Sequence, residues 1–437
     1  MTDRSRRVPS ARIARLAAFG QIAGGVASGV LGEGVRRLAR GERPQLPDLL
    51  LTPANARKVT EQLSRLRGAA MKLGQMLSLD AGDLLPAELT AILAQLRDSA
   101  HIMPPRQLDR VLTDAWGPDW RRRFARFEAG PLAAASIGQV HRAVLPSGQE
   151  IAVKVQYPGV AASIDADIDN VATLLRLSGL LPAGLDVAPL LAEAKRQLHE
   201  EADYLREAEQ MRLYGALLRD DTRFAVPTPV DDLLRPTVLP MTFQPGAPIE
   251  ALSSAPEEQR NAAMTALLEL VLRELFDFGL MQTDPNFANY RWQADSGRIV
   301  LLDFGATRAV APGIVRSYRT LLQAGLSGDV GAIRAALVTA GFVSPAQDQR
   351  HGALIETMIG LVLRHVETSR SGLFDFADRS FVAELRDRAA PMLTDRASWH
   401  LPPAETIFVQ RKISGTALLC VRLQARLPLL DLLARHA

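Results

Sequence analysis

Residues Gln282–Gly305, QTDPNFANYRWQADSGRIVLLDFG, decide the fold of this chain. The stretch places Asn289 five positions after Asp284, and a turn and a short apolar strand then lead to Asp303-Phe304-Gly305. In phosphoryl-transfer sites, an Asp faces the nucleophile, an Asn five residues later holds one Mg²⁺, and an Asp at a strand end holds the other metal ion. The stretch therefore predicts a site for metal ions and phosphate.

Each of these motifs has a plainer explanation when it is taken alone. Asp-Phe-Gly is also how a strand runs into a glycine turn, and Asp-x-x-x-x-Asn is a weaker pattern still. Their order, with a strand between them, favours a protein-kinase-like site over the plainer explanations.

The composition excludes several other classes of site. A single cysteine, Cys420, rules out an internal disulfide and is best explained as a small buried apolar side chain. The seven histidines have no ligand spacing, so no zinc or haem site is indicated. No basic stripe with interleaved aromatic residues occurs, so nucleic acid is not an expected partner. Lysine occurs only at positions 58, 72, 154, 195 and 412, so a lysine inside a motif is informative.

The first 45 residues predict a basic, Gly-rich membrane-associating helix followed by a linker. The uncharged run 16–32 is shorter than the roughly 20 apolar residues of a spanning helix, and it lacks a signal-peptide cleavage pattern. Two Gly-x-x-x-Gly spacings, which begin at Gly20 and Gly25, allow close helix contact and also a homodimer. Because arginines on both flanks suit anionic headgroups, we expect peripheral or shallow insertion. A short span and a soluble packing helix are the alternatives.

Residues 46–115 predict a helical extension that contains the motif RGAAMKLGQMLSLD. Lys72 and Gln75 lie three positions apart and share a helix face. A solvated lysine beside a polar glutamine is the plain interpretation. Against it, the neighbours are strongly apolar, and a buried ammonium requires a carboxylate partner.

Carboxylates for the motif lysines are available in HEEADYLREAEQM, within a long helix predicted over Val187–Leu218. They belong to Glu201, Asp203 and Glu207. Glu201 and Asp203 do not share one face of a regular helix, so a cap or distortion is required if both point inward.

Residues 131–156 predict a loop, a strand, a turn at Pro146-Ser147-Gly148 and a second strand with Lys154 at its centre. A protein kinase holds its nucleotide phosphates with a lysine in this place and covers them with a G-x-G-x-x-G loop. This chain has alanines in the loop and only one glycine, Gly138. Because the Cβ of alanine narrows the accessible backbone angles, we expect a stiffer cover.

The second half of the chain predicts strands at Phe224–Asp232 and Thr237–Phe243, a hinge at Gln244-Pro245-Gly246 and an apolar helix over Ala262–Phe278. From Pro312 to the end the pattern is almost entirely helical. Between Gly305 and that helical region only GATRAVAPG is present, with no Ala-Pro-Glu anchor. A platform for a peptide substrate cannot be built from so short a segment.

Six motifs in order resemble the UbiB/AarF/ADCK family of atypical kinase-like proteins, in its coenzyme Q branch. They are RGAAMKLGQMLS, AAASIGQVHRA, AVKVQYPGV, EEADYLREA, QTDPNFANY and LLDFGATR, and the resemblance runs from about Val8 to Leu427. It implies an α+β, protein-kinase-like bilobal fold with a mostly helical C-lobe and an N-terminal helical extension packed over the active site. The implied domains are the membrane-associating segment 1–45, the extension 46–115, the N-lobe 116–245 and the C-lobe 246–437.

The resemblance also implies roles for particular residues. The catalytic set is Lys154, Asp284, Asn289 and Asp303, with Asn289 and Asp303 as metal ligands. The nucleotide-binding set is Ala133, Ala134, Ala135, Ser136, Gly138, Gln139, Lys154, Glu207, Met241, Thr242 and Phe243. The gating set, which lays the extension across the place of a peptide substrate, is Lys72, Gly74, Gln75, Glu201 and Asp203. The chain departs from its branch near Thr242, where an acidic residue is usual. Because adenine contacts at the hinge are made mainly by the backbone, this departure bears on which hinge residues contact the nucleotide more than on whether the nucleotide binds.

The function implied is that of an ATP-dependent atypical kinase or ATPase that uses ATP and Mg²⁺. It would support ubiquinone biosynthesis at a membrane and couple ATP binding and hydrolysis to the handling of lipid intermediates. A small-molecule or lipid kinase and a nucleotide-gated scaffold without turnover are the alternatives, and the intact catalytic set argues against the scaffold.

Expected partners are ATP, anionic membrane lipids, prenylated quinone precursors and other ubiquinone-biosynthesis proteins. The Arg- and Ala-rich composition, with no transit-type extension, favours a bacterial protein. We therefore expect it at the cytoplasmic face of the bacterial inner membrane.

Overall fold

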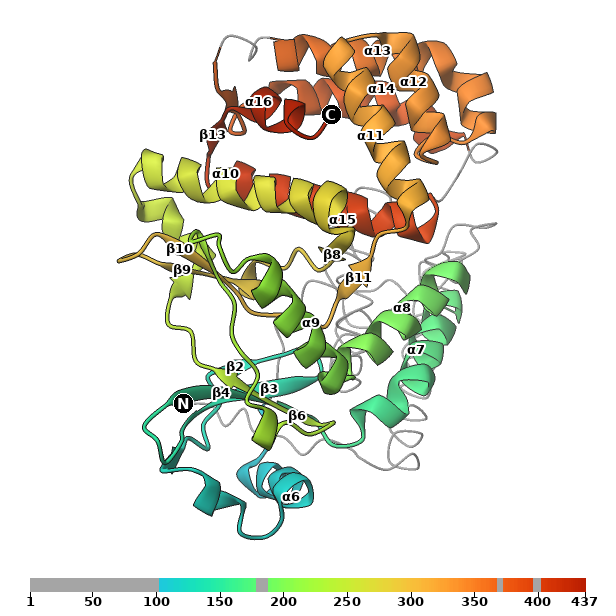
Figure 1. Ribbon diagram of the computed structural model, residues 1–437. Coiled ribbons are helices and arrows are strands. Elements are labelled where there is room, and N and C mark those ends of the chain that lie inside the picture. The colour runs from blue at the N-terminus through green and yellow to red at the C-terminus, as the bar shows by residue number, and fades with distance from the viewer. Residues whose placement is uncertain (1–101, 178–187, 368–371, 396–401) are drawn as a thin grey trace, which may run out of the picture. The chain divides into compact units, whose positions relative to one another are not determined.

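The computed structural model describes residues 102–177, 188–367, 372–395 and 402–437 (Figure 1). The chain divides into two compact units. The first contains the residues up to Arg212 together with Thr228–Phe243, and the second contains Leu213–Pro227 and Gln244–Ala437. The predicted segment 1–45 and most of 46–115 lie outside the described residues, so the four-part division stays a prediction.

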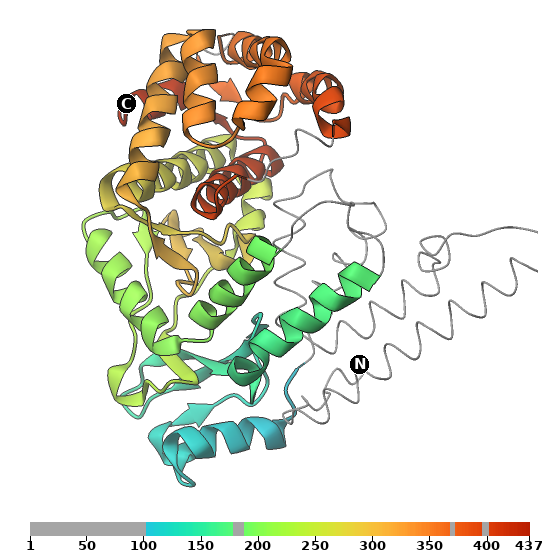
Figure 2. The same cartoon turned by 90° about the vertical axis from the view of Figure 1, so that its right-hand side faces the viewer.

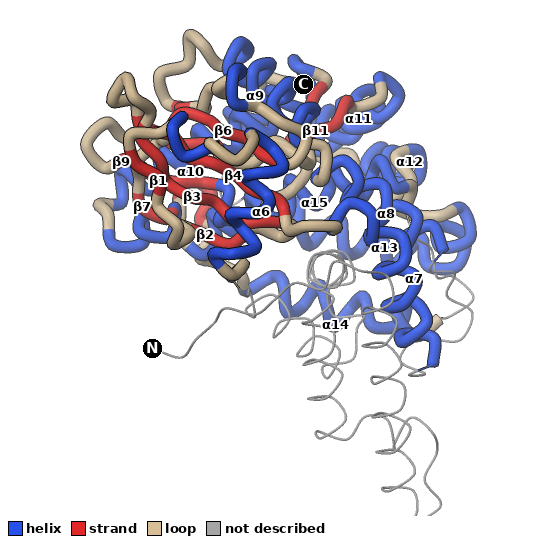
Figure 3. The backbone as a smooth tube through the Cα atoms, turned by 90° about the horizontal axis from the view of Figure 1, so that it is seen from below, coloured by secondary structure: helices blue, strands red, loops and turns tan. Residues whose placement is uncertain are grey.

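The first unit is built on an antiparallel sheet in the order β1-β3-β4-β6, and β2 pairs with the first part of β3 on the same edge as β1. Figure 3 shows β1, β3, β4 and β6 side by side. Its strands are β1 (Arg126–Phe127), β2 (Ala133–Ala134), β3 (Gly138–Val144), β4 (Glu150–Gln156) and β6 (Val238–Thr242). The predicted hairpin is confirmed, since β3 and β4 pair along their whole length, and Gly148 in the turn has φ +86°. Ile151, Val153 and Val155 of β4 are buried, as expected of a central strand.

An aromatic cluster joins α6 (Pro105–Trp116) to the edge of this sheet. The rings of Trp116, Trp120, Phe124 and Phe127 form it, with the centroids of contacting rings 5.0–6.5 Å apart. Trp116 ends α6, Trp120 begins η2 (Trp120–Arg123), Phe124 directly follows η2 and Phe127 ends β1. The indole N–H of Trp116 also donates to the carbonyl of Leu233, at 2.8 Å. The cluster therefore fixes α6 to the segment that precedes β6.

Among the described residues, the first unit also includes, wholly or in part, α7 (Val160–Leu177), α8 (Ala188–Glu201) and α9 (Tyr204–Leu217). The prediction of one long helix over Val187–Leu218 was wrong, because the chain breaks between α8 and α9. At the break, the Asp203 carboxylate accepts a hydrogen bond from the backbone N–H of Arg206 at 3.0 Å, which is an N-terminal cap for α9. Glu201 is buried and Asp203 is exposed, so the two carboxylates do not both point inward.

The second unit contains three small sheets. The largest has the order β5-β10-β9-β7, formed by β5 (Phe224–Ala225), β10 (Arg298–Leu301), β9 (Tyr290–Gln293) and β7 (Ala247–Pro248). The others pair β8 (Leu280–Gln282) with β11 (Thr307–Ala309), and β12 (Phe374–Asp375) with β13 (Arg426–Leu427).

The predicted strands at Phe224–Asp232 and Thr237–Phe243 are shorter than expected. Pro227 and Pro229 lack the backbone N–H that a continuing ladder needs.

Helices make up the rest of the second unit, as predicted. They are α10 (Glu257–Arg273), which continues into a π-helical turn over Glu274–Phe278, α11 (Pro312–Ser327), α12 (Val330–Thr339), α13 (Pro345–Glu367), α14 (Ser380–Thr394), α15 (Ala404–Arg422) and α16 (Leu429–Ala434). Short 3-10 turns cover Asp231–Leu233 in the first unit and Ile249–Ser254 and Phe287–Asn289 in the second.

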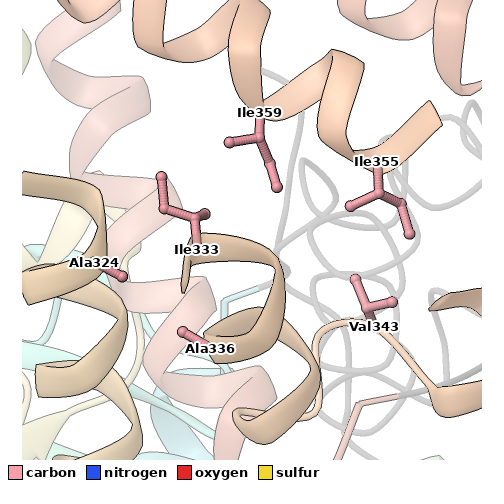
Figure 4. Packing of buried hydrophobic residues seen from close by; sticks show 6 residues of the cluster. All are labelled: Ala324, Ile333, Ala336, Val343, Ile355 and Ile359. Atoms are coloured by element: carbon pink, nitrogen blue, oxygen red, sulfur yellow. The ribbon is translucent and has the colours of Figure 1, made fainter. Parts of the chain in front are cut away.

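Two apolar clusters hold these helices together. Ile333 and Ala336 of α12 pack against Ala324 of α11 and against Ile355 and Ile359 of α13 (Figure 4). The second cluster joins α10, its π-helical turn, β8, α11 and α15, through Val271, Leu275, Met281, Tyr318 and Val409. In Figures 1 and 2, α15 lies alongside α10, in agreement with their contacts. The second cluster lies next to the segment predicted to be catalytic, which follows β8.

An ion-pair network fixes the turn between α9 and β5 to α10. Asp221 accepts hydrogen bonds from Arg223, at 2.8 and 2.9 Å, and from Arg273 of α10, at 2.7 Å. These bonds, led by those from Arg223, hold the pKa of Asp221 at about 2, below its usual value of 3.8, although partial burial opposes the shift. Because the pKa of Asp221 is lower in the folded protein than in the unfolded chain, its ionised carboxylate stabilises the fold. This stabilisation is fully present at pH values above the unfolded-state pKa.

We expect Asp221→Asn to lower the free energy of unfolding by about 1 kcal/mol at pH 7, an amount reduced for solvent screening of a partly exposed group. The difference from wild type should fall to about half near pH 3, because the wild-type contribution is lost as the pH falls from about 4 towards about 2. Urea unfolding at pH 7 and pH 3 measures this difference in the free energy of unfolding. Asp220→Asn, at the exposed neighbouring position, is the control and should show neither effect. A deficit for Asp221→Asn that is equal at pH 7 and pH 3 would contradict the linkage.

Candidate functional site

A buried ion pair lies at the centre of the first unit. Lys154 Nζ donates to both carboxylate oxygens of Glu207, at 2.8 and 2.9 Å. The two side chains are 9% and 0% exposed, and the ammonium lies 5.2 Å from the centre of the Tyr204 ring. Two charges at this depth are stable only when they are paired. Because Lys154 lies on the central strand β4 and Glu207 on α9, the pair joins that helix to the sheet.

The alanine-rich loop forms a tight turn between β2 and β3 that is held at three points. Ala135 N–H donates to Gly138 O at 2.9 Å, and the carbonyl of the buried Ile137 accepts from Tyr157 N–H at 2.9 Å. Ser136 Oγ donates to Glu201 Oε2 at 3.0 Å. The turn is therefore fixed to the residue that follows β4 and to the last residue of α8, an arrangement that favours the stiff cover expected from the alanines.

Gly138 is required where β3 leaves this turn. A Cβ built on Gly138 would lie 2.3 Å from the carbonyl oxygen of Val155 and 3.0 Å from Tyr204 Oη. The first contact is with the backbone of β4 near the end of the β3–β4 ladder, and backbone held by pairing has little room to move. The single glycine of the loop thus serves the close approach of two strands, whereas the alanines Ala133 and Ala134 lie exposed in β2.

Gln139 differs from its predicted place, because its side chain is turned into the protein. It is 1% exposed; its Oε1 accepts from Met103 N–H at 2.8 Å and its Nε2 lies 2.8 Å from His141 Nε2. Burial lowers the pKa of His141, against the opposing hydrogen bond with the Glu128 carbonyl, so the imidazole is neutral at pH 7. The Gln139 side chain therefore ties Met103, two residues before α6, to the sheet.

The predicted hinge residues lie at the end of β6 and just beyond it. Met241 is buried, and Thr242 Oγ1 accepts from Thr228 N–H at 2.9 Å. Phe243 N–H donates to the Glu150 carbonyl at 3.0 Å, and the Arg142 guanidinium lies 4.7 Å from the centre of the Phe243 ring. All three residues belong to the first unit, which also carries Lys154 and the alanine-rich loop.

The second unit carries the other predicted catalytic residues, and two of them, Asp284 and Asn289, lie on a loop between two short antiparallel ladders. The Asp284 loop, residues 283–289, starts directly after β8 and ends directly before β9. Asn289 Nδ2 lies 3.3 Å from the Asp284 carbonyl oxygen and 3.4 Å from Asp284 Oδ2, so the Asn side chain closes the loop on itself. At the loop entry, Thr283 Oγ1 and N–H both donate to the carbonyl of Ala306, at 2.8 and 3.1 Å.

Asp303 lies beside this loop because β9 and β10 pair. Leu302 N–H donates to the Asn289 carbonyl at 3.0 Å, which sets Asn289 and Asp303 next to each other at one end of the ladder. Asp303 Oδ1 accepts from Gly305 N–H at 3.0 Å, so a turn fixes the carboxylate. Asp284, Asn289 and Asp303 thus lie near one another within the second unit, and their catalytic and metal-binding roles stay a prediction.

The chemistry of these side chains fits Mg²⁺. Asp303 offers a carboxylate and Asn289 an amide oxygen, and the hydrogen bonds of Asn289 to Asp284 run through its nitrogen. Mg²⁺ takes hard oxygen ligands, usually one or two from carboxylates and the rest from phosphates and water. Within the described residues, no cluster of three or more His, Cys, Asp or Glu side chains could hold a metal ion.

Of the gating residues, Lys72, Gly74 and Gln75 lie outside the described residues. Glu201 and Asp203 lie at the break between α8 and α9, where Glu201 contacts the alanine-rich loop through Ser136. The contact of Lys72 with these carboxylates therefore stays a prediction.

Sequence reasoning missed a group of buried polar residues next to the Asp284 loop: Tyr214, Glu274, Gln282, Tyr290 and Lys412. A signal for one of them was available. Lys412 is one of only five lysines in a chain whose other cationic side chains are arginines, so a specific partner for its ammonium could have been sought.

Comparisons with known proteins agree with this geometry. Residues 95–337 match the family described as the ABC1 atypical kinase-like domain. The chain belongs to the ABC1 atypical kinase-like family. The yeast protein "Atypical kinase COQ8, mitochondrial" from Saccharomyces cerevisiae is 38% identical over 427 residues, which cover 97% of this chain and 84% of the yeast protein. "Atypical kinase COQ8B, mitochondrial" from Rattus norvegicus is 38% identical over 444 residues, covering 99% and 82%.

A solved structure of Rv3197 from Mycobacterium tuberculosis in complex with erythromycin is similar with a TM-score of 0.61 and 28% identity, and the match covers 87% of this chain and 95% of that one. The predicted family and the α+β, kinase-like bilobal fold are confirmed. The family also confirms an ATP-dependent atypical kinase or ATPase. Among the described helices, none is both long and apolar enough to cross a membrane.

We expect Gly138→Ala to lower the free energy of unfolding by about 1–3 kcal/mol, because the new methyl group would overlap the Val155 carbonyl and push β3 from β4. Urea unfolding measures the change. Gly130→Ala is the matched control, since a Cβ there meets nothing within 4 Å, and it should stay within about 0.5 kcal/mol of wild type. Equal stabilities for the two variants would contradict the close approach.

Proposed function

We propose that the protein binds ATP with Mg²⁺ and hydrolyses it in support of ubiquinone biosynthesis at a membrane, with turnover coupled to the handling of lipid intermediates. The observation that supports this most strongly is that all four catalytic residues are present and that each unit holds its own members by defined contacts. Lys154 is paired in a buried position, and the Asp284 loop is closed by Asn289 next to Asp303. A scaffold that only binds a nucleotide would not need all four residues. The names of the COQ8 relatives support the ubiquinone pathway.

In this proposal each residue has a role that follows from its chemistry. The Lys154 ammonium binds nucleotide phosphate oxygens, and Glu207 holds that ammonium in place. The Asp284 carboxylate accepts a hydrogen bond from the attacking hydroxyl or water and orients it. Asn289 and Asp303 are the metal ligands. When bound, Mg²⁺ would supply positive charge to the phosphate oxygens.

The nucleotide itself would be held mostly by backbone. The residues at the end of β6, Met241, Thr242 and Phe243, are the proposed contacts for the adenine. Ala133, Ala134, Ala135, Ser136 and Gly138 form the proposed cover of the phosphates. For Gln139, whose side chain binds Met103 N–H and His141, only a backbone contact is proposed.

The segment after Asp-Phe-Gly supports an acceptor other than a protein. Residues Thr307–Ala309 are paired with β8 as β11, and α11 begins at Pro312. A protein kinase uses a long segment here to form its peptide platform. Because these residues are already used in the fold, we propose water or a small molecule as the phosphoryl acceptor.

The membrane part of the proposal rests on the sequence before residue 102. We propose that segment 1–45 associates with anionic lipids at the cytoplasmic face of a bacterial inner membrane, and that Lys72, Gly74 and Gln75 place segment 46–115 over the active site with Glu201 and Asp203. Prenylated quinone precursors and other ubiquinone-biosynthesis proteins are the proposed partners, and the Gly-rich helix is a candidate contact for a homodimer.

The test is ATP hydrolysis by the full chain, with and without vesicles that contain anionic lipid, together with tracing of labelled γ-phosphate into prenylated phenols. We expect phosphate release that depends on Mg²⁺ and rises with vesicles. Asp303→Asn should remove Mg²⁺-dependent nucleotide binding, because it removes a charged ligand. Asp295→Asn, in the exposed turn between β9 and β10, is the matched control and should behave as wild type.

Each contrary outcome has a separate meaning. Labelled phosphate in the prenylated phenol would mean that the protein is a lipid kinase, and the proposal of ATP hydrolysis would be replaced. ATP binding without release or transfer would favour the scaffold. Unchanged affinity for ATP and Mg²⁺ in Asp303→Asn would overturn the metal assignment.

A further inference from the structure

A buried ammonium lies next to the loop that carries Asp284. Lys412 of α15 has a side chain that is 3% exposed, and its Nζ lies 2.9 Å from Tyr290 Oη, 3.1 Å from Gln282 Oε1 and 3.5 Å from Glu274 Oε2. An ammonium has three N–H donors and no acceptor, so three oxygen atoms match its capacity. Arginine supplies nearly all the positive charge of this chain, and its planar fork would not fit three oxygens that converge on one point.

The contacts of Lys412 join the two ends of the Asp284 loop. Gln282 is the last residue of β8, directly before the loop, and Tyr290 is the first residue of β9, directly after it. One ammonium therefore binds side chains at both the entry and the exit. A loop closed in this way has less freedom to change its path than one held only by its flanking ladders.

Glu274 completes the cluster and fixes it to α10. Its Oε1 accepts from Tyr214 O–H at 2.7 Å and from Gln282 N–H at 3.3 Å. Burial raises the pKa of Glu274, against the opposing effect of Lys412; burial also tends to lower the pKa of Lys412, but Glu274 and Tyr290 raise it above its usual value. We take the pair as charged, because Glu274 accepts from two donors and Lys412 is surrounded by oxygen atoms.

A second contact from α15 reaches the loop itself. Gly415 lies three residues after Lys412, on the same face of the helix. A Cβ at Gly415 would lie 2.2 Å from the Cβ of Pro285, the residue that follows Asp284. The helix therefore packs against the loop through a position that allows no side chain.

We propose that Lys412 is a positioning residue for the reaction. By joining Gln282 to Tyr290 it fixes the path of the Asp284 loop, and hence the directions of the Asp284 carboxylate and the Asn289 amide. This inference rests on the proposed role of Asp284 in ATP turnover. Small displacements of a catalytic group cost large factors in rate, so a cluster that touches neither nucleotide nor acceptor can still control kcat.

The kinetic test compares four variants of the full chain. Lys412→Met removes the ammonium, Tyr290→Phe removes only the hydroxyl, and Lys412→Met with Glu274→Gln removes both charges so that no buried ion is left alone. Lys195→Met, which breaks a partly exposed pair with Asp169, is the matched control for the loss of a lysine. We expect kcat to fall about 10- to 100-fold in Lys412→Met and in the double variant, with KM for ATP within about threefold of wild type. The kcat of Tyr290→Phe should lie between the values for these two variants and that of wild type. The kcat of Lys195→Met should equal that of wild type.

Melting temperature separates positioning from stability. The double variant should melt close to wild type while its kcat stays low. If the double variant regained both the stability and the kcat of wild type, Lys412 would only support the fold. Wild-type kcat in both Tyr290→Phe and the double variant would overturn the inference. If Lys412→Met does not fold, Tyr290→Phe and the double variant still decide between positioning and stability.

Hydrogen–deuterium exchange of the peptide that spans residues 282–290 tests the loop without relying on turnover. We expect faster exchange of this peptide in the double variant and in Tyr290→Phe, with no change in the peptides of β3 and β4. If exchange rises but the wild-type chain hydrolyses no ATP, the positioning role stands and the proposed turnover fails. Unchanged exchange in both variants would overturn the positioning role.

Discussion

The buried pair of Lys154 and Glu207 is the interaction on which the rest of the structure depends. A lysine in the middle of a central strand cannot stay charged in an apolar sheet unless a carboxylate meets it. That requirement sets where α9 must start, and the chain meets it by ending α8 at Glu201 and capping α9 with Asp203. The last residues of the same helix belong to the second unit, and there the Tyr214 hydroxyl donates to Glu274 of that unit.

The second unit solves a related problem for the Asp284 loop. The residues of this loop are mostly small or polar, and apart from Thr283 and Pro285 they are partly or fully exposed, so little apolar area holds the loop in place. Two short ladders, the Asn289 contact with Asp284, and the Lys412 cluster supply the missing constraints. The segment after Gly305 enters β11 at once, so the loop is closed off on that side by pairing with β8.

The parts of the site that the sequence predicts are those in which the chemistry lies within one short segment. Lys154 on its strand, the Asp284–Asn289 spacing and the strand into Asp303 all depend on local periodicity and turn residues. The break between α8 and α9 was missed, because helix propensity is continuous across Glu201–Tyr204 and only tertiary contacts decide that Glu201 is buried. The meeting of Lys412 with Glu274, and the inward turn of Gln139, depend on packing between distant segments, which no local pattern encodes.

The dependence of nucleotide handling on the Lys154–Glu207 pair is tested most directly by a double-mutant cycle on the affinity for ATP with Mg²⁺. The cycle uses Lys154→Met, Glu207→Gln and the combined variant, measured by titration of the full chain. If Glu207 acts by holding the ammonium, the second substitution should add little to the first, with a coupling free energy above about 1 kcal/mol. Effects that add within about 0.3 kcal/mol would mean that the two groups contribute independently, and would contradict the central role of the pair.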